Sequence, residues 1–149
     1  MKWYKLVGST TPGQQVDEDW EHDDPGTFAE VRFPWNKPPS DICLHDGIII
    51  QAVGDTGLMA VQKVVGRPGI KPRRGPKGSL NDRWPHTIEV VTEFFCSPLA
   101  RAPKLRDVYP DFAEKYAHLF RNGSHWRIRD AEFDKLADAI RQAGRRYSP

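Results

Sequence analysis

Three histidines are the residues of this 149-residue chain whose type and spacing could support acid–base chemistry. His45, His86 and His125 fall on or next to stretches that predict β-strands. Two histidines held close together can act as general acid and general base, so a metal-free ribonuclease is one hypothesis. The alternative is structural, because a histidine on a half-buried strand commonly hydrogen-bonds a backbone group.

The segment 66–81 carries the strongest signal for a partner. It is rich in glycine and proline and concentrates positive charge, although the whole chain has a formal net charge of only +2. The cations of this segment and of the residues just after it are Arg67, Lys71, Arg73, Arg74, Lys77 and Arg83. Such a loop can contact a phosphate backbone, where the release of counterions favours binding. An ordinary solvated loop has the same composition, so both interpretations stay open on this evidence.

Three tryptophans favour nucleic acid as the partner. Trp35, Trp84 and Trp126 stand at the ends of predicted strands, beside polar or basic residues. Proteins that bind single strands or flipped nucleotides stack bases on such aromatic faces. We expect at least one of the three to belong to the core instead, because tryptophan is also a large apolar residue.

Other classes of chemistry find little support. No G-x-S-x-G elbow is present, and no Walker or G-x-G-x-x-G motif follows a strand. Neither His22 with Asp23 and Asp24 nor His45 with Asp46 has the spacing of a known metal-ligand set. Cys43 and Cys96 lie in apolar runs, which predicts buried free thiols and no disulfide. We therefore expect no cofactor and no metal site.

Periodicity predicts the elements that would position these residues. Strands are expected over 2–7, 27–33, 42–53, 58–65, 85–95 and 124–128, with Asp46-Gly47 either a tight turn or a bulge. Helices are expected over 110–120 and 130–144, the second capped by Asp130 and Gly144. Strands followed by helices predict an α+β domain with a small, curled, mostly antiparallel β-barrel and two or more flanking helices.

Length and composition predict one domain spanning residues 1–149. A hydrophobic content of 38% and five tryptophans are typical of a globular chain of this size. No apolar stretch of 18 residues and no signal-peptide core is present, so a soluble cytoplasmic protein without a membrane partner is the default expectation.

Several short motifs add to this order of elements. "KWYKL" opens the chain, Val31-Arg32 lies in "FAEVRF", Asp41 and His45 lie in "SDICLHD", and Trp84 lies in "DRWPHTIEV". With "GLMAVQKVV" and "GSHWRIRDAEFDKL", they make most of the chain similar to the EVE domains of the PUA-like superfamily, which are related in fold to the YTH and ASCH domains. The chain departs from the family where "KLVGSTTPG" replaces Lys-Ser-Glu-Pro, where no Asn follows Arg32, and where Leu44 replaces a tyrosine. The ASCH signature is also absent.

This resemblance implies a barrel with a pocket for a modified nucleobase on DNA or RNA. The expected pocket residues are Trp35 and Trp84 for stacking, Ser40, Asp41 and His45 for polar edges, and Trp126 as a further candidate. The basic residues named above would then hold flanking phosphates. We therefore predict a non-catalytic nucleic-acid-binding module. The alternatives are an RNA-cleaving or base-modifying enzyme that uses the histidines, and a plain protein-interaction domain.

Overall fold

The computed structural model describes most of the chain, namely residues 1–8, 15–22, 26–54, 57–66, 77 and 83–148. In the described residues the strands are β1 (Lys2–Val7), β2 (Glu30–Phe33), β3 (Gly47–Ala52), β4 (Leu58–Val64), β5 (His86–Phe95), β6 (His125–Ile128) and β7 (Arg145–Arg146). The helices are α1 (Gly26–Ala29), α3 (Leu105–Val108), α4 (Pro110–Lys115), α5 (Ala117–Asn122) and α6 (Asp130–Ala143), with two 3-10 turns at Trp20–His22 and Leu99–Arg101. Strands β1 to β5 come before helices α3 to α6, as predicted.

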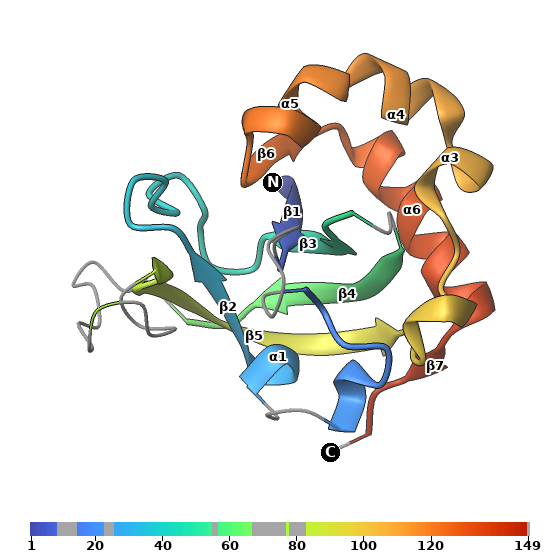
Figure 1. The fold of residues 1–149 in the computed structure, drawn as a ribbon, viewed down its shortest axis with the longest axis horizontal. Coiled ribbons are helices and arrows are strands. Elements are labelled where there is room, and N and C mark those ends of the chain that lie inside the picture. The colour runs from blue at the N-terminus through green and yellow to red at the C-terminus, as the bar shows by residue number, and fades with distance from the viewer. Residues whose placement is uncertain (9–14, 23–25, 55–56, 67–76, 78–82, 149) are drawn as a thin grey trace.

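The strands form one curled sheet in the order β2-β5-β4-β3-β1-β6, with β7 paired to β5 (Figure 1). The pair β1–β3 is parallel and the other pairs are antiparallel. Strand β5 changes partners along its length, because its first part, 86–89, pairs with β2 and its later part, 90–95, pairs with β4, while Phe94 and Phe95 also pair with β7. The predicted α+β fold with a mostly antiparallel, barrel-like sheet is confirmed.

The two ends of this strand order, β2 and β6, share no backbone ladder among the described residues. Side chains bridge them instead. The ring of Phe33 at the end of β2 meets the ring of His125 at the start of β6, with centroids 4.9 Å apart in an edge-to-face arrangement. We call this junction the seam.

Strand β1 is buried on both faces along residues 3–6, and apart from Lys5 these residues are aromatic or apolar. Tyr4 contacts Phe112 and stacks on Trp126, on the face that the helices cover. Lys5 lies on the other face, where its amine is 4.9 Å from the centre of the Phe33 ring. Alternation along β1 therefore sends Lys5 into the curled sheet, towards the seam.

Helix α6 packs its apolar stripe on β1, β3, β4 and β5, while α3, α4 and α5 form an arc beside it (Figure 1). The helix begins one residue earlier than predicted, because Arg129 and not Asp130 occupies the N-cap, and Asp130 is the first helical residue. Gly144 ends it as predicted. A Cβ atom at this glycine would collide with the carbonyl oxygen of Phe95, so the close approach to β5 requires glycine.

Three predicted elements have different bounds. Residues 26–29 form α1 instead of extending the strand, because Phe28 packs in a ring stack with Trp20 and Tyr147. The predicted strand 42–53 begins only at Gly47, because residues 43–46 form a tight turn in which the Asp46 N–H donates to the Cys43 carbonyl, just before the Asp46-Gly47 pair at which a turn or bulge was expected. The predicted helix 110–120 is divided into α4 and α5 at residue 116.

The prediction of two buried thiols is half wrong. Cys96 is buried, but Cys43 is exposed because it lies in the turn before β3 and not in a strand. Both are free, as expected.

Candidate nucleic-acid interface at the seam

Lys5 is the charged residue at the centre of the seam. Only 3% of it is exposed, and its Nζ donates to the Leu6 carbonyl at 2.6 Å and to the Ser124 hydroxyl at 3.0 Å. Burial, together with the positive charge of Lys37, lowers the pKa of Lys5 to about 7. Near neutral pH a large share of this amine is therefore uncharged, and an uncharged amine that donates its two N–H groups keeps a lone pair that can accept a hydrogen bond.

His125 pairs with Lys5 across the β1–β6 ladder and carries an unsatisfied polar atom. Its Nδ1 is buried and has no hydrogen-bond partner among the described residues. Burial, and next the charge of Lys5, lower the pKa of His125 to about 4, although Asp41 acts in the opposite direction. The ring is therefore neutral at pH 7, with one nitrogen that donates and one that accepts.

Aromatic rings enclose this imidazole. The Trp3 ring lies 5.9 Å from the His125 ring and the Phe33 ring lies 4.9 Å from it, centroid to centroid. Trp3 and Phe33 are both buried. A buried polar atom without a partner is uncommon in native proteins, and it calls for an explanation such as a ligand. We call Lys5, Phe33 and His125 the seam site.

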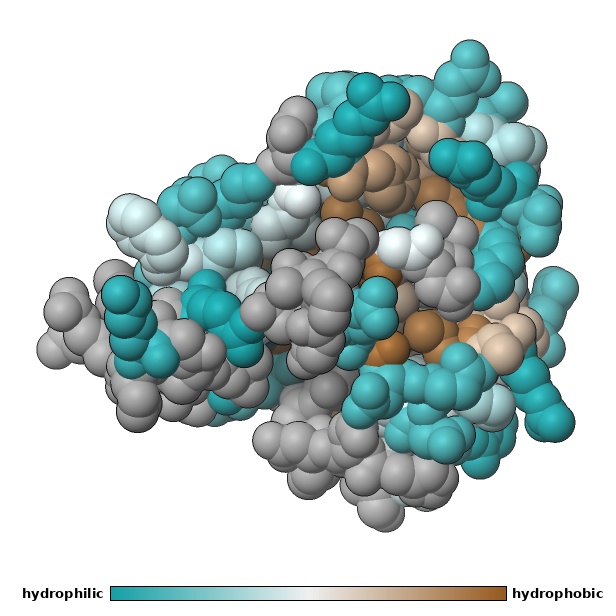
Figure 2. All heavy atoms as spheres, in the orientation of Figure 1, coloured by the Kyte–Doolittle hydropathy of each residue, from teal (hydrophilic) through white to brown (hydrophobic). Residues whose placement is uncertain are grey.

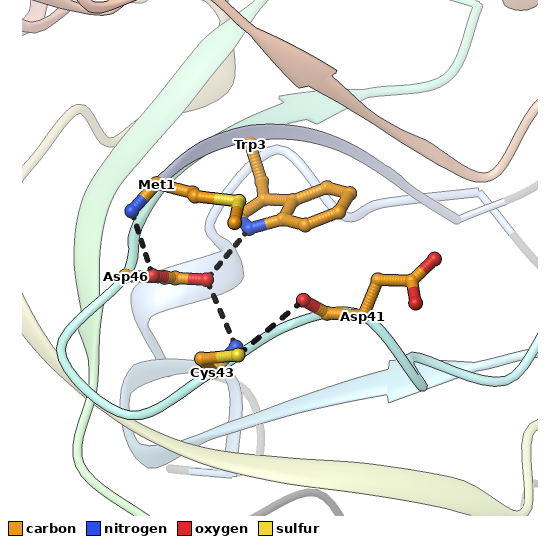
Figure 3. Close-up of polar contacts among 5 residues, drawn as sticks. All are labelled: Met1, Trp3, Asp41, Cys43 and Asp46. Atoms are coloured by element: carbon orange, nitrogen blue, oxygen red, sulfur yellow. Dashed lines mark hydrogen bonds and ion pairs between the residues drawn. The ribbon is translucent and has the colours of Figure 1, made fainter.

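Asp46 fixes the loop that borders the seam site (Figure 3). Its carboxylate accepts from the Met1 amine at 2.8 Å, from Trp3 Nε1 at 2.8 Å and from the Cys43 N–H at 2.9 Å. Burial favours the neutral acid, but these hydrogen bonds outweigh it and hold the pKa of Asp46 below its ordinary value. Figure 3 shows the Asp41 side chain on the same side of this loop as the Trp3 ring. These hydrogen bonds of Asp46 thus hold the loop that carries Asp41, whose charge acts on His125, at the border of the seam.

The two predicted stacking residues lie at the outer end of the β2–β5 ladder. Phe33 pairs with His86, so Trp35 and Trp84 each stand two residues beyond this pair, on opposite strands. His86 Nε2 lies 3.1 Å from the Trp35 carbonyl oxygen, which keeps the two chains close after the ladder ends. Trp35 is 71% exposed, and Trp84 is half-buried with the Arg83 guanidinium 4.9 Å from its ring.

The other predicted pocket residues are spread more widely. Ser40 and Asp41 are exposed in the loop between β2 and β3. His45 is exposed in the turn beside β4, where its backbone has a φ of 74° and its N–H donates to the Val64 carbonyl. Trp126 is buried on the face of β6 opposite His125, where its ring contacts those of Tyr4, Tyr116 and Phe120. Its ring therefore faces the helices and not the seam.

Most of the predicted phosphate-binding residues cannot be placed relative to the seam. Arg67, Lys71, Arg73 and Arg74 lie outside the described residues. Lys77 is an exposed turn residue, and Arg83 is half-buried beside Trp84. Of these six cations, Arg83 is the one that the described contacts connect to a predicted stacking ring.

Sequence patterns did not reveal Lys5 and Phe33. Lys5 belongs to a short aromatic strand, and a lysine there is ordinarily expected to reach solvent. The sequence feature that could have indicated Lys5 is its position between apolar residues in "KWYKLV". In the structure this strand is buried on both faces, where a lysine is unusual.

The described residues place limits on other kinds of site. No group of three or more His, Cys, Asp or Glu side chains among them could hold a metal ion. Within the same residues, none of the helices has the length and apolarity needed to cross a bilayer.

Comparison with known proteins supports the fold. No protein-family model matches the chain, and no curated protein matches it. The crystal structure of the DUF55 domain of human thymocyte nuclear protein 1 superposes with a TM-score of 0.52 at 11% identity, over 95% of this chain and 99% of that one. The NMR structure of Rpa0253 from Rhodopseudomonas palustris aligns with a TM-score of 0.45 at 12% identity, over 93% and 92% of the two chains. The chain thus shares the α+β fold of the DUF55 domain.

Proposed function

We propose that this protein is a non-catalytic module that binds nucleic acid and recognises one base, in modified form, at the seam. The observation that carries the proposal is the buried Nδ1 of His125, which has no hydrogen-bond partner in the described part of the chain and lies beside the Lys5 amine, at the junction between β2 and β6, the two ends of the strand order. A base edge offers both donors and acceptors, so it could satisfy both groups at once.

The flat surfaces that a base needs are close to these polar groups. Trp35 and Trp84 stand two residues beyond the Phe33–His86 pair, and Phe33 itself contacts His125. A base that left its strand would stack on the exposed Trp35 ring or on Trp84 and direct its polar edge inwards. The buried rings of Trp3 and Phe33 would favour an added apolar group, which is why we expect a modified base.

Phosphate contacts would supply affinity without distinguishing one base from another. Arg83 is the best-supported contact, because it lies beside Trp84. Lys77 and the four basic residues between 67 and 74 remain candidates for the same role. Each phosphate contact would make binding weaker as salt rises.

The test is a titration of labelled single-stranded DNA and RNA oligonucleotides, with and without a modified base, followed by fluorescence anisotropy at several salt concentrations. We expect Trp35→Ala and Trp84→Ala each to weaken binding by about 5- to 150-fold, because stacking contributes about 1–3 kcal/mol per base. Val91→Ala is the matched control, since Val91 is also an exposed apolar residue, 46% exposed, on the solvent face of β5. Absence of binding to every oligonucleotide, or equal affinity of all four proteins, would contradict the proposal.

The RNA oligonucleotides of this titration also distinguish the binding module from the enzymatic alternative, because an enzyme would cleave them. A histidine acid at neutral pH must be protonated, whereas the pKa of His125 is lowered to about 4. This weighs against His125 as a general acid. Cleavage of the RNA without added metal, lost in His86→Ala and His125→Ala, would support the enzyme instead of the binding module.

A further inference from the structure

A second site lies on the other side of β1 from the seam site. A surface pocket of about 230 Å³ opens between the arc of α3, α4 and α5 and the ends of β1 and β3. Its walls come from Leu6, Gln51, Val53, Gly54, Leu105, Arg106, Ala113, Ala117, Phe120 and Arg121. Figure 2 shows apolar surface gathered in the hollow beneath the arc. We call this the arc pocket.

The described lining of the arc pocket has an apolar interior and positive charge. Leu6 and Leu105 are buried, and Phe120 is half-buried. Arg106 and Arg121 are exposed, and neither has an ion-pair or hydrogen-bond partner among the described residues. No Asp or Glu belongs to this lining. The charge pattern therefore favours an anion that also carries an apolar group.

Gln51 adds a polar group inside the pocket. It is 1% exposed, and its Oε1 accepts from the Tyr4 hydroxyl. Its Nε2 carries two N–H groups, and its single contact among the described residues is a long one, 3.4 Å to the Ala52 carbonyl. One N–H group is thus available to a carbonyl oxygen of a bound chain.

The size of the arc pocket suits a single side chain. Sites for drug-sized ligands have volumes of roughly 300–1,000 Å³, larger than this pocket. A large apolar side chain that enters such a pocket is a common anchor of protein–protein interfaces. The chain's own acidic segment around Trp20, residues 17–21, does not offer that anchor, because Trp20 is 2% exposed and its Nε1 donates to the Cys96 carbonyl at 2.9 Å.

We propose that the arc pocket binds a peptide segment of a partner protein in which one large apolar side chain is flanked by carboxylates. The apolar side chain would occupy the space over Leu6, Ala117 and Phe120. The flanking carboxylates would pair with the guanidinium groups of Arg106 and Arg121. This site is separate from the seam site, because Leu6 and Lys5 face opposite sides of β1.

The probe is an acetylated and amidated peptide with a central Phe flanked by Asp and Glu, titrated into ¹⁵N-labelled protein and followed by NMR. We expect shifts of the amide signals of Val53, Ala113 and Ala117, with the signal of His125 unchanged. Replacing the central Phe of the peptide by Gly should weaken binding about tenfold or more. Replacing its acidic residues by Lys should abolish binding.

Variants of the protein test the pocket directly. Ala117→Leu should fill the pocket and abolish peptide binding, while Ala131→Leu, at an exposed alanine in the first turn of α6, should leave it unchanged. Arg106→Gln and Arg121→Gln should each weaken binding about two- to fivefold, in line with exposed ion pairs.

Three results would overturn the proposal. The first is that the acidic peptide does not bind, and the second is that it binds wild-type protein and Ala117→Leu equally well. The third is that a single-stranded oligonucleotide displaces the peptide, because the pocket would then be part of a nucleic-acid surface. Failure of nucleic-acid binding at the seam would leave the peptide result unaffected, because the two titrations use different probes and different variants.

Discussion

Lys5 is a residue whose position costs stability, because the folded protein surrounds an amine that water would otherwise solvate. Burial lowers the pKa of Lys5 to about 7 from its ordinary value of 10.5. Between these two pH values the unfolded chain binds a proton that the folded chain releases. The free energy of unfolding therefore rises as pH increases through that window. Below pH 7 the protein bears the whole destabilisation that the burial of Lys5 causes.

Lys5→Met tests this cost. At pH 6 we expect the free energy of unfolding of the variant to exceed that of the wild type by on the order of a few kcal/mol. The variant is more stable because an apolar side chain of similar length replaces a buried charge. The difference should shrink as pH rises from about 7 towards 10.5. Urea denaturation at several pH values measures it, with Lys63→Met as the control at an exposed lysine of β4. A difference that does not vary with pH would contradict this account of Lys5.

At the scale of elements, Glu132 joins the arc to α6. Only 1% of it is exposed, and its carboxylate accepts from the Tyr116 hydroxyl at 2.9 Å, from the Arg129 N–H at 2.9 Å and from Lys115 Nζ at 3.2 Å. Burial favours the neutral acid, but these hydrogen bonds prevail and hold the pKa of Glu132 below 4.5. Tyr116 is also the residue at which one predicted helix becomes two, since its backbone, with φ of -104° and ψ of 15°, departs from helical geometry between α4 and α5.

Glu132→Gln should destabilise the protein by about 1–3 kcal/mol at pH 7, because hydrogen bonds to a charged group are lost. Glu132 contributes stability above the ordinary pKa of a glutamate, and this contribution is lost as pH falls through the lowered pKa of the folded state. The difference between wild type and variant should therefore diminish in acid. Thermal unfolding at pH 7 and pH 3 measures it, and Glu114→Gln on the exposed face of α4 should show no such difference. A loss of stability that is equal at both pH values would argue against the charge of Glu132 as its cause.

At the scale of the whole molecule, Phe33 holds together two strand edges that backbone hydrogen bonds do not join in the described part of the chain. It is 0% exposed, and it touches both His125 of β6 and the Lys5 amine of β1. The closure of the sheet thus depends on side-chain packing at the seam, where the proposed ligand would bind. Such a closure can open more readily than a hydrogen-bonded ladder.

Phe33→Ala should cost about 3 to 5 kcal/mol of stability, as is usual for the truncation of a buried phenylalanine. Amide hydrogen exchange should also become faster in β2 and β6 than in β3 and β4, because the seam loses its packing. Phe112→Ala is the matched control, since Phe112 is as deeply buried but lies on the helix side of β1. Equal acceleration in all four strands of the Phe33 variant would mean that this ring contributes only to the global core.

Local patterns in the sequence were sufficient for much of the fold. Periodicity predicted the strands β1 to β6, the apolar stripe of α6, and Gly144 at its end, but not the short strand β7. These features depend on neighbours along the chain, so a short window contains the information needed to recognise them. The positions of Trp35 and Trp84 at strand ends followed from the same patterns.

Only the tertiary structure decided which faces of the strands are covered by other segments of the chain. It placed β1 between β3 and β6, and so buried Lys5 on one side and Tyr4 on the other. It directed Trp126 towards the helices and left Trp35 exposed, although both stood at predicted strand ends. The physical reason is that burial and pKa depend on segments more than a hundred residues away, such as β6 beside β1, and these segments meet only when the sheet curls.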